Sequence, residues 1–122
     1  MPAEGRDLVI LVTRGTDHEL SSVAFTIANG GLTAGLRVAI FLTSSAVDLV
    51  RRGAASTTHV KPLEPLEEMM RDFLARGGII WACTPCVNAR GYTQHQLIEG
   101  VTISGASPMH ELIKNGAATL SF

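Results

Sequence analysis

Residues 78–91, GIIWACTPCVNARG, decide the fold and hold the most informative chemistry of this chain. The apolar run 79–82 predicts a buried strand, because it is continuous rather than alternating. A proline and a glycine bracket the residues that follow, as they do in a short helix. The only two cysteines of the chain, Cys83 and Cys86, lie at this junction. Ligands and reactive groups of α/β proteins gather where parallel strands end, so we expect the functional site here.

Strands and helices alternate along the rest of the chain. Apolar runs predict strands over residues 8–12, 38–42, 79–82, 101–104 and 117–122. Capping signals, prolines and apolar positions at helical spacing predict one helix over 46–52 and others that begin at Thr16, Pro65, Thr93 and Ser107. Strands separated by helices form a parallel sheet with right-handed crossovers. The pattern therefore predicts one three-layer α/β/α domain that spans residues 1–122.

The composition is that of a globular protein. Of the 122 residues, 46% are apolar and 17% are charged, and the net charge is −1. The sequence has no basic stripe and no aromatic stacking platform, so nucleic acid is not an expected partner. No apolar run approaches the roughly 18 residues that span a bilayer, and no signal peptide is recognisable, so we expect a cytoplasmic protein without a membrane partner. The apolar fraction is high for so short a chain, and we expect other copies to cover part of it.

The chemistry of the cysteine pair depends on which sulfur ionises. In a reducing compartment a C-x-x-C pair is more often catalytic, redox-active or metal-binding than a structural disulfide. A thiol reacts as its thiolate, which the N-terminus of a helix favours. The proline two residues after Cys83 places Cys83 near the N-cap, so we predict Cys83 as the nucleophile. Cys86, one turn in, is the predicted resolving or second-transfer thiol, and Arg90 adds positive charge if it folds back.

The alternatives for the pair are two buried, inert thiols, a zinc site or a thioredoxin-like redox centre. One C-x-x-C supplies only two of the four ligands that structural zinc needs. The four histidines form no H-x-x-x-H pair, so we expect no metal. Thioredoxin motifs follow an early strand, whereas most of this chain precedes the cysteines, which argues against that fold.

A second candidate feature follows the first predicted strand. Arg14, Gly15 and Thr16 precede a predicted helix, and unpaired backbone N–H groups at such a position attract anions. A tight turn that caps the helix is the simpler interpretation of the same residues. His18, in the first helical turn, is the histidine that we expect nearest to the site. The sequence has no phosphate-binding glycine loop, so we expect no nucleotide cofactor. It has no G-x-S-x-G elbow either, so the nucleophilic serine of a hydrolase is not expected.

The motif C-x-x-C-x-N-A-R-G at 83–91, followed by L-I-E-G-V at 97–101, points to a known family. With these motifs the chain resembles the DsrE/DsrF-like family of small sulfur-handling proteins, and most closely its YchN-like branch. The resemblance implies a five-stranded parallel sheet between helices, assembled as a homotrimer or a hexamer. It also implies cytoplasmic sulfur relay, in which a cysteine accepts sulfane sulfur as a persulfide and passes it to a partner. The family's spacing to Arg90 assigns the relay to Cys83.

The resulting hypothesis is a relay of the sulfurtransferase type that needs no metal or organic cofactor. Cys83 attacks the outer sulfur of a donor persulfide, and the thiolate of an acceptor protein then takes that sulfur. In a second route, Cys86 attacks the inner sulfur, releases sulfide and leaves a disulfide. The residues expected on the substrate side are Arg90, Arg14, Thr16 and His18. Two alternatives from other classes are a non-catalytic oligomeric binding or redox-sensor module and a thiol peroxidase.

Overall fold

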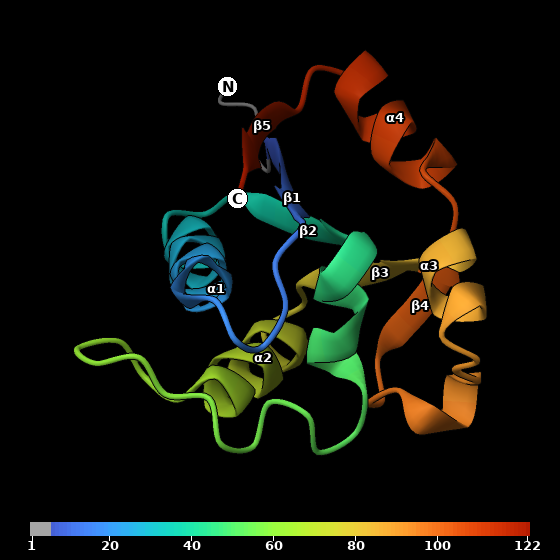
Figure 1. Ribbon diagram of the computed structural model, residues 1–122. Coiled ribbons are helices and arrows are strands. Elements are labelled where there is room, and N and C mark those ends of the chain that lie inside the picture. Colours follow the sequence, from blue (N-terminus) through green and yellow to red (C-terminus); the bar gives the residue numbers. More distant parts are fainter. Residues whose placement is uncertain (1–5) are drawn as a thin grey trace.

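Five parallel strands form a single sheet in the computed structural model, which describes residues 6–122 (Figure 1). The strand order is β4-β3-β2-β1-β5. The strands are β1 (Asp7–Val12), β2 (Arg37–Leu42), β3 (Ile79–Cys83), β4 (Val101–Ser104) and β5 (Ala118–Ser121). All five predicted strands are confirmed, and the predicted α/β fold with a five-stranded parallel sheet is correct.

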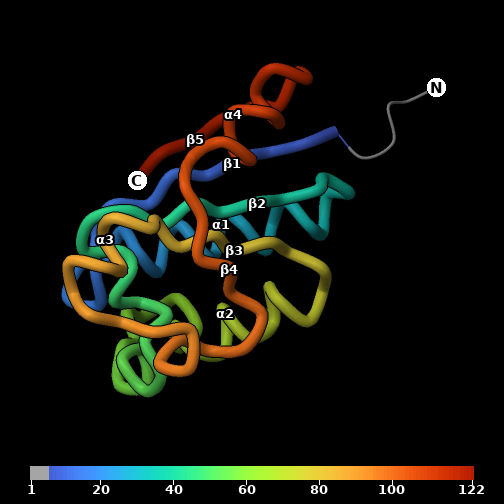
Figure 2. Tube along the Cα trace, turned by 90° about the vertical axis from the view of Figure 1, so that its right-hand side faces the viewer, coloured from blue at the N-terminus to red at the C-terminus, as the bar shows by residue number. Residues whose placement is uncertain are grey.

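The connections between strands are helical. The α-helices are α1 (Glu19–Thr33), α2 (Leu66–Ala75), α3 (Thr84–Ala89) and α4 (Ser107–Lys114). Two 3₁₀ helices, η1 (Ser44–Val50) and η2 (Gln94–Gln96), complete the set. In Figures 1 and 2, α1 and α2 lie on one side of the sheet and α4 lies on the other. Within residues 6–122, no helix combines the length and the apolar character needed to cross a membrane.

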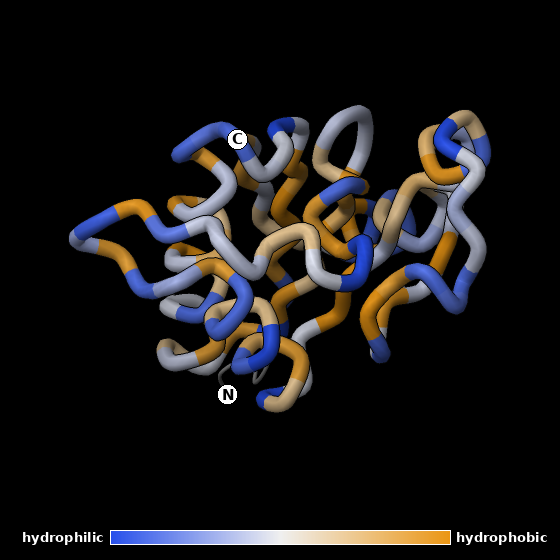
Figure 3. The backbone as a smooth tube through the Cα atoms, turned by 60° about the horizontal axis from the view of Figure 1, so that its bottom comes forward, coloured by the Kyte–Doolittle hydropathy of each residue, from blue (hydrophilic) through white to orange (hydrophobic). Residues whose placement is uncertain are grey.

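The main core lies between the sheet and the layer formed by α1 and α2. Leu8, Ile10 and Val12 of β1 alternate with residues of the opposite face, and all three are buried against this layer. Ile10 pairs in register with Ile40 of β2, and the aromatic rings of α1 and α2 meet edge to face beneath them. Figure 3 shows the same arrangement as hydrophobic chain in the interior and hydrophilic chain at the loops. Burial of this one sheet face supplies most of the hydrophobic stabilisation.

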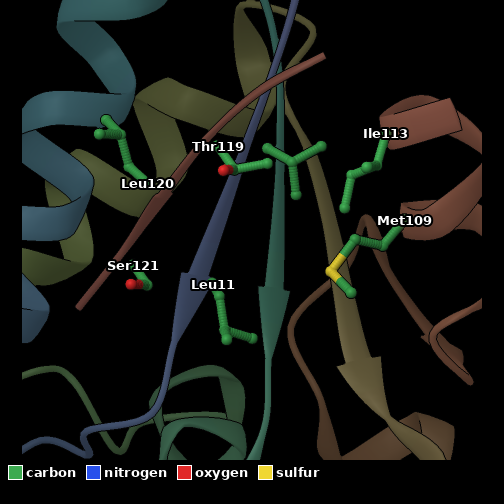
Figure 4. A pocket seen from close by; sticks show the side chains of 7 residues that line it. Leu11, Met109, Ile113, Thr119, Leu120 and Ser121 are labelled. Atoms are coloured by element: carbon green, nitrogen blue, oxygen red, sulfur yellow. The ribbon is translucent and has the colours of Figure 1, made fainter. Parts of the chain in front are cut away.

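The opposite face of the sheet has only α4 as a cover. None of the residues of α4 is buried, although the helix is clearly amphipathic. Met109 and Ile113 of α4 point toward Leu11 of β1 across a cavity of about 480 Å³, which Figure 4 shows from close by. Neither cysteine lines this cavity. The third layer is therefore present but thin.

His18, rather than Thr16, caps the first helix, so the predicted start of that helix is wrong. The backbone of His18 is extended (φ −127°), and its Nδ1 accepts the N–H of Leu20 at 3.1 Å. The buried hydroxyl of Ser21 donates to the carbonyl of Gly15 at 2.7 Å. This bond ties the loop that contains Gly15 to the first turn of α1.

The helix predicted over 46–52 is a 3₁₀ helix that begins two residues earlier, at Ser44. It ends at Val50 because Arg51 turns to an extended conformation (φ −67°, ψ 134°) and forms an isolated antiparallel bridge with Leu97. The bridge partner lies far along the chain, so local sequence signals do not predict this end.

The other helix predictions agree better with the structure. The helix predicted from Pro65 is α2, with Pro65 as its N-cap, and the helix predicted from Ser107 is α4. The capping box predicted at Thr93 is present: the Thr93 side chain bonds to the backbone of Gln96, and the Gln96 side chain accepts the backbone N–H of Thr93 at 2.8 Å. The helix that it opens is nevertheless a single 3₁₀ turn, Gln94–Gln96.

Candidate functional site

Both cysteines lie where β3 gives way to α3. Cys83 is the last residue of β3 and the N-cap of α3, and Cys86 is the third residue of that helix. Each side chain is half-buried, and neither sulfur forms a disulfide. Because β2 neighbours β3 in the sheet, with Leu42 opposite Ala82, the residues after β2 lie beside the cysteines. The sequence therefore placed both sulfurs at the correct junction.

The sulfur of Cys86 is the one that receives the hydrogen bonds of the site. The backbone N–H of Ser44 donates to Cys86 Sγ at 3.2 Å, and the hydroxyl of Thr43 lies 3.5 Å from the same sulfur. Donors around a sulfur favour its anion. The Thr43 hydroxyl is the main reason that the pKa of Cys86 is lowered; partial burial opposes it, and Ser44, the Cys83 thiol and the charge of Arg90 add to the lowering.

The backbone at Ser44 has an unusual conformation. Its φ of 53° lies in the left-handed region, and among residues 6–122 it is the one non-glycine residue with a positive φ. For an ordinary L residue this region costs about 1–2 kcal/mol. Its N–H is the backbone donor to Cys86. A strained residue at a chemical site is typical of backbone that the surrounding structure holds in place for function.

Cys83 occupies the predicted N-cap position but makes no capping hydrogen bond through its side chain. The neighbouring Cys83 thiol helps to lower the pKa of Cys86. The two cysteine side chains therefore lie close to each other at the end of β3. We expected the N–H groups at the start of α3 to stabilise the Cys83 sulfur, whereas the donors found at the site contact the Cys86 sulfur and come from the residues after β2.

A carboxylate organises the residues that follow α3. Asp48 Oδ1 accepts a hydrogen bond from the hydroxyl of Tyr92 at 2.6 Å and one from Arg90 Nε at 3.1 Å. The Asp48 carboxylate, as acceptor of this bond, raises the pKa of Tyr92. Arg90 Nη1 also donates to the carbonyl of Cys86 at 3.3 Å. Arg90 thus folds back toward Cys86, which the sequence left open, and its guanidinium is paired with Asp48.

A polar hollow of about 380 Å³ lies next to the sulfur site. It is lined by Thr13, Arg14, Gly15, Asp17, His18, Ser44 and Ser45. Ser44 lines the hollow and its N–H contacts Cys86 Sγ, so Arg14 and His18, two of the residues predicted on the substrate side, line a hollow that adjoins the sulfur site. Thr16 does not line the hollow, and its carbonyl accepts a bond from the Thr58 hydroxyl at 3.2 Å.

The side chains that commonly ligate metals are not clustered in the described part of the chain. Within residues 6–122, no three side chains among His, Cys, Asp and Glu are grouped so that they could hold a metal ion. The groups described at the site are the two thiols, their hydrogen-bond donors and the neighbouring charges.

Four residues of the site were not among the sequence predictions: Thr43, Ser44, Asp48 and Tyr92. One signal pointed to the first two, because a polar turn follows the predicted strand 38–42. Neighbouring parallel strands end at the same edge of a sheet, so such a turn lies beside the turn that follows the next strand. Asp48 and Tyr92 are 44 positions apart, and no local pattern relates them.

Sequence comparisons find archaeal relatives. An uncharacterized protein of Methanopyrus kandleri is 31% identical over 112 residues, which are 90% of this chain and 87% of that protein. An uncharacterized protein of Methanocaldococcus jannaschii is 30% identical over 101 residues, or 82% of this chain. The chain spans only 37% of the length of that second relative.

Comparisons of structure and of family pattern agree on the fold. A protein of unknown function from Methanobacterium thermoautotrophicum superposes with a TM-score of 0.74 at 19% identity. The ychN protein from E. coli gives a TM-score of 0.74 at 21% identity. Each superposition covers 96% of this chain and 99% of the other. The sequence model of one family matches residues 6–122, and by that match the chain belongs to the DsrE/DsrF-like family.

Proposed function

We propose that this protein accepts sulfane sulfur as a persulfide at the Cys83–Cys86 pair and relays it to an acceptor thiol. The observation that carries the proposal is the pair of hydrogen bonds to Cys86 Sγ, from the Ser44 N–H at 3.2 Å and the Thr43 hydroxyl at 3.5 Å. They favour a thiolate at a half-buried position, which is the reactive form of a cysteine. Membership of the DsrE/DsrF-like family suggests the same type of role.

The relay needs two displacements at sulfur and no net oxidation. The Cys86 thiolate attacks the outer sulfur of a donor persulfide, a new S–S bond forms, and the donor leaves as its thiolate. Cys86 then carries the persulfide. The thiolate of the acceptor attacks the outer sulfur in turn, takes it, and regenerates the Cys86 thiolate.

A second outcome is open to the loaded pair because Cys83 is adjacent. After losing its proton, Cys83 attacks the inner sulfur of the Cys86 persulfide and releases hydrosulfide, which leaves a Cys83–Cys86 disulfide. A reductant is then required before the next cycle. This route unloads the protein when no acceptor is bound.

The cysteine proposed here as the first nucleophile is not the one predicted from the sequence. The family resemblance puts the persulfide on Cys83, whereas the hydrogen bonds support Cys86. Intact mass spectrometry after incubation with inorganic polysulfide distinguishes them. We expect a gain of about 32 Da, one sulfur atom, that Cys83→Ser keeps and Cys86→Ser loses.

The same experiment tests the relay as a whole. If the adduct requires Cys83 but not Cys86, the roles are exchanged and the relay stands. If neither Cys83→Ser nor Cys86→Ser, in which no internal disulfide can release the sulfur, gains sulfur under conditions that load a small-molecule thiol, the relay proposal fails. Consumption of peroxide with a sulfenic acid on either cysteine would instead support a thiol peroxidase.

The polar hollow beside Ser44 is the proposed contact for the donor or acceptor. Arg14 and His18 are positioned there to face an anionic group of that partner, and Arg90 adds positive charge on the α3 side of the sulfurs. We place the chemistry in the cytoplasm, where both thiols stay reduced. No metal or organic cofactor enters the proposed steps.

We also propose a homo-oligomer, a trimer or a hexamer as the family resemblance implies. The support is the thin layer on the second face of the sheet. Ile113 of α4 is 38% exposed, Ile79 of β3 on the same face of the sheet is 47% exposed, and no residue of α4 is buried. Exposed apolar surface of this kind is typical of a face that another chain covers.

A further inference from the structure

Three sets of bonds join η1 to the segment that contains α3 and η2. At one end, Ser44 and Thr43 contact the sulfur of Cys86. In the middle, Asp48 accepts bonds from Arg90 and Tyr92. At the other end, the join is made by backbone: the N–H of Arg52 donates to the carbonyl of Gln96 at 2.8 Å, and the N–H of Ile98 donates to the carbonyl of Val50 at 2.9 Å.

Asp48 has no favourable electrostatic role toward a thiolate. It does not hydrogen-bond to either sulfur, and a carboxylate near Cys86 disfavours the anion by repulsion. The site nevertheless favours that anion. Asp48 of η1 therefore needs a different explanation, and its hydrogen bonds to Arg90 and Tyr92 supply one.

We propose that Asp48 is a positioning residue that clamps η1 to the end of α3 and thereby holds the Ser44 N–H and the Thr43 hydroxyl against the Cys86 sulfur. The inference rests on the proposed function only in taking Cys86 as the reactive sulfur. Asp48 acts through Arg90 and Tyr92 and touches no reacting atom.

The connection from Asp48 to Cys86 is short and can be followed bond by bond. Asp48 Oδ1 holds Arg90 Nε, and Arg90 Nη1 holds the carbonyl of Cys86. Tyr92 reaches the same oxygen from the other side of Gly91, which has a φ of 70° and turns the chain. One carboxylate oxygen thus fixes both flanks of the turn that ends α3.

The length of α3 makes such a clamp necessary. The helix has six residues, and isolated helices shorter than about 12 residues are marginal in water. Its position must therefore come from contacts outside itself. Buried Val87 packs α3 on the core, and the carbonyl of Val87 accepts the N–H of Tyr92 at 3.1 Å. Through its bond to Arg90, Asp48 connects α3 to η1, the element that carries the Ser44 donor.

Several charged or titratable groups surround the sulfur and bear on any pH measurement. From α3 and β3 they are Arg90 and Cys83, and from η1 there is Asp48. Across Ser44, the polar hollow adds Arg14, Asp17 and His18. Arg51 lies near Tyr92.

The test is the pKa of Cys86, measured as the pH dependence of iodoacetamide alkylation in the Cys83→Ser protein. The sign of the pKa change of Cys86 in Asp48→Asn distinguishes a positioning role of Asp48 from a direct effect of its charge. If Asp48 acted only as a charge, its neutralisation would lower the pKa. If it positions the donors, we expect a rise of about one unit, which slows alkylation about tenfold below the pKa.

Tyr92→Phe is the second variant, because it removes one bond to Asp48 and changes no charge. We expect a smaller rise of the Cys86 pKa, in the same direction. Asp17→Asn is the matched control: this carboxylate lines the neighbouring hollow, so its neutralisation should leave the pKa unchanged or lower it. Thermal unfolding establishes that each variant is folded.

A Cys86 pKa at or below the parent value in folded Asp48→Asn overturns the proposal. If Asp48→Asn does not unfold cooperatively, Tyr92→Phe decides by the same criterion. The alkylation measurement involves no sulfur donor, so the sulfur relay can fail while the positioning role of Asp48 holds, and the reverse.

Discussion

The reactivity of the site depends on a few hydrogen-bond donors around one sulfur atom. Cys86 Sγ contacts the Ser44 N–H and the Thr43 hydroxyl, and Thr43 contributes most to the lowered pKa of Cys86. The Thr43 side chain caps no helix, since η1 has no side-chain capping bond. Its hydroxyl is therefore free to serve the sulfur, and it can be removed with little other structural change.

Replacement of Thr43 by valine should raise the pKa of Cys86. Valine has nearly the shape of threonine but no hydroxyl donor, so the thiolate loses a hydrogen bond. Thr43→Ser keeps the hydroxyl and should keep the lowered pKa. The pH profile of Cys86 alkylation measures both variants. An unchanged profile in folded Thr43→Val would show that the hydroxyl does not stabilise the anion.

The lowered pKa of Cys86 also makes stability depend on pH. The folded state binds this proton less tightly than the unfolded state, so the thiolate stabilises the fold above the ordinary thiol pKa of 9.0. That contribution is lost as the pH falls from 9.0 through the lowered folded-state value. Relative to Cys86→Ser, the free energy of unfolding should decrease over this range. Urea titrations at a series of pH values measure the difference, and parallel curves for the two proteins would contradict it.

At the scale of elements, α1 and β3 are held by close contacts that only small residues permit. In α1, a Cβ at Gly31 would meet Val38 Cγ2 at 3.0 Å and Leu8 Cδ2 at 3.3 Å, whereas a Cβ at Gly30 would meet nothing within 4 Å. At the start of β3, a Cβ at Gly78 would lie 2.4 Å from the ring of Phe73. These glycines allow helix and sheet to approach each other.

The adjacent glycines of α1 give a matched pair of substitutions. Gly30→Ala should stabilise the protein by about 0.5–1 kcal/mol, because alanine is the better helix former and meets no neighbour. Gly31→Ala gains the same propensity but must displace two packed side chains, at a cost of about 1–3 kcal/mol. Urea unfolding of the two variants should therefore give opposite signs. Equal stabilisation by both would mean that the approach of α1 to the sheet is not tight.

At the scale of the whole molecule, the two faces of the sheet are unequally covered. The face toward α1 and α2 is closed by the core, and the face toward α4 is not. Figure 4 shows Met109 and Ile113 of α4 facing the sheet at the cavity that separates α4 from the strands. This imbalance, and not the site itself, is what supports assembly with further copies.

Sedimentation velocity should therefore give a mass that is three or six times the 12.9 kDa of one chain. Ile113→Lys places a charge on the open face and should shift the protein toward smaller species. Ile27→Lys is the control, since Ile27 is similarly exposed, at 40%, but lies on α1. A single-chain mass for the unmodified protein at micromolar concentration would contradict the proposed assembly.

The sequence by itself determined the elements and the position of the cysteines. The continuous apolar run at 38–42, the helical stripe after Pro65 and the capping box at Thr93 each encode local structure, because each signal involves residues a few positions apart. The turn from strand to helix at Cys83 is of the same kind. These features could be predicted without knowledge of the fold.

Only the tertiary structure decided which sulfur is favoured as the anion. Ser44 and Cys86 are 42 positions apart, and they meet because β2 and β3 are neighbours in the sheet. The 3₁₀ form of η1 and the clamp at Asp48 likewise depend on partners far along the chain. Local patterns specify what each segment forms, but hydrogen bonds between segments depend on the order of the strands, which those patterns do not encode.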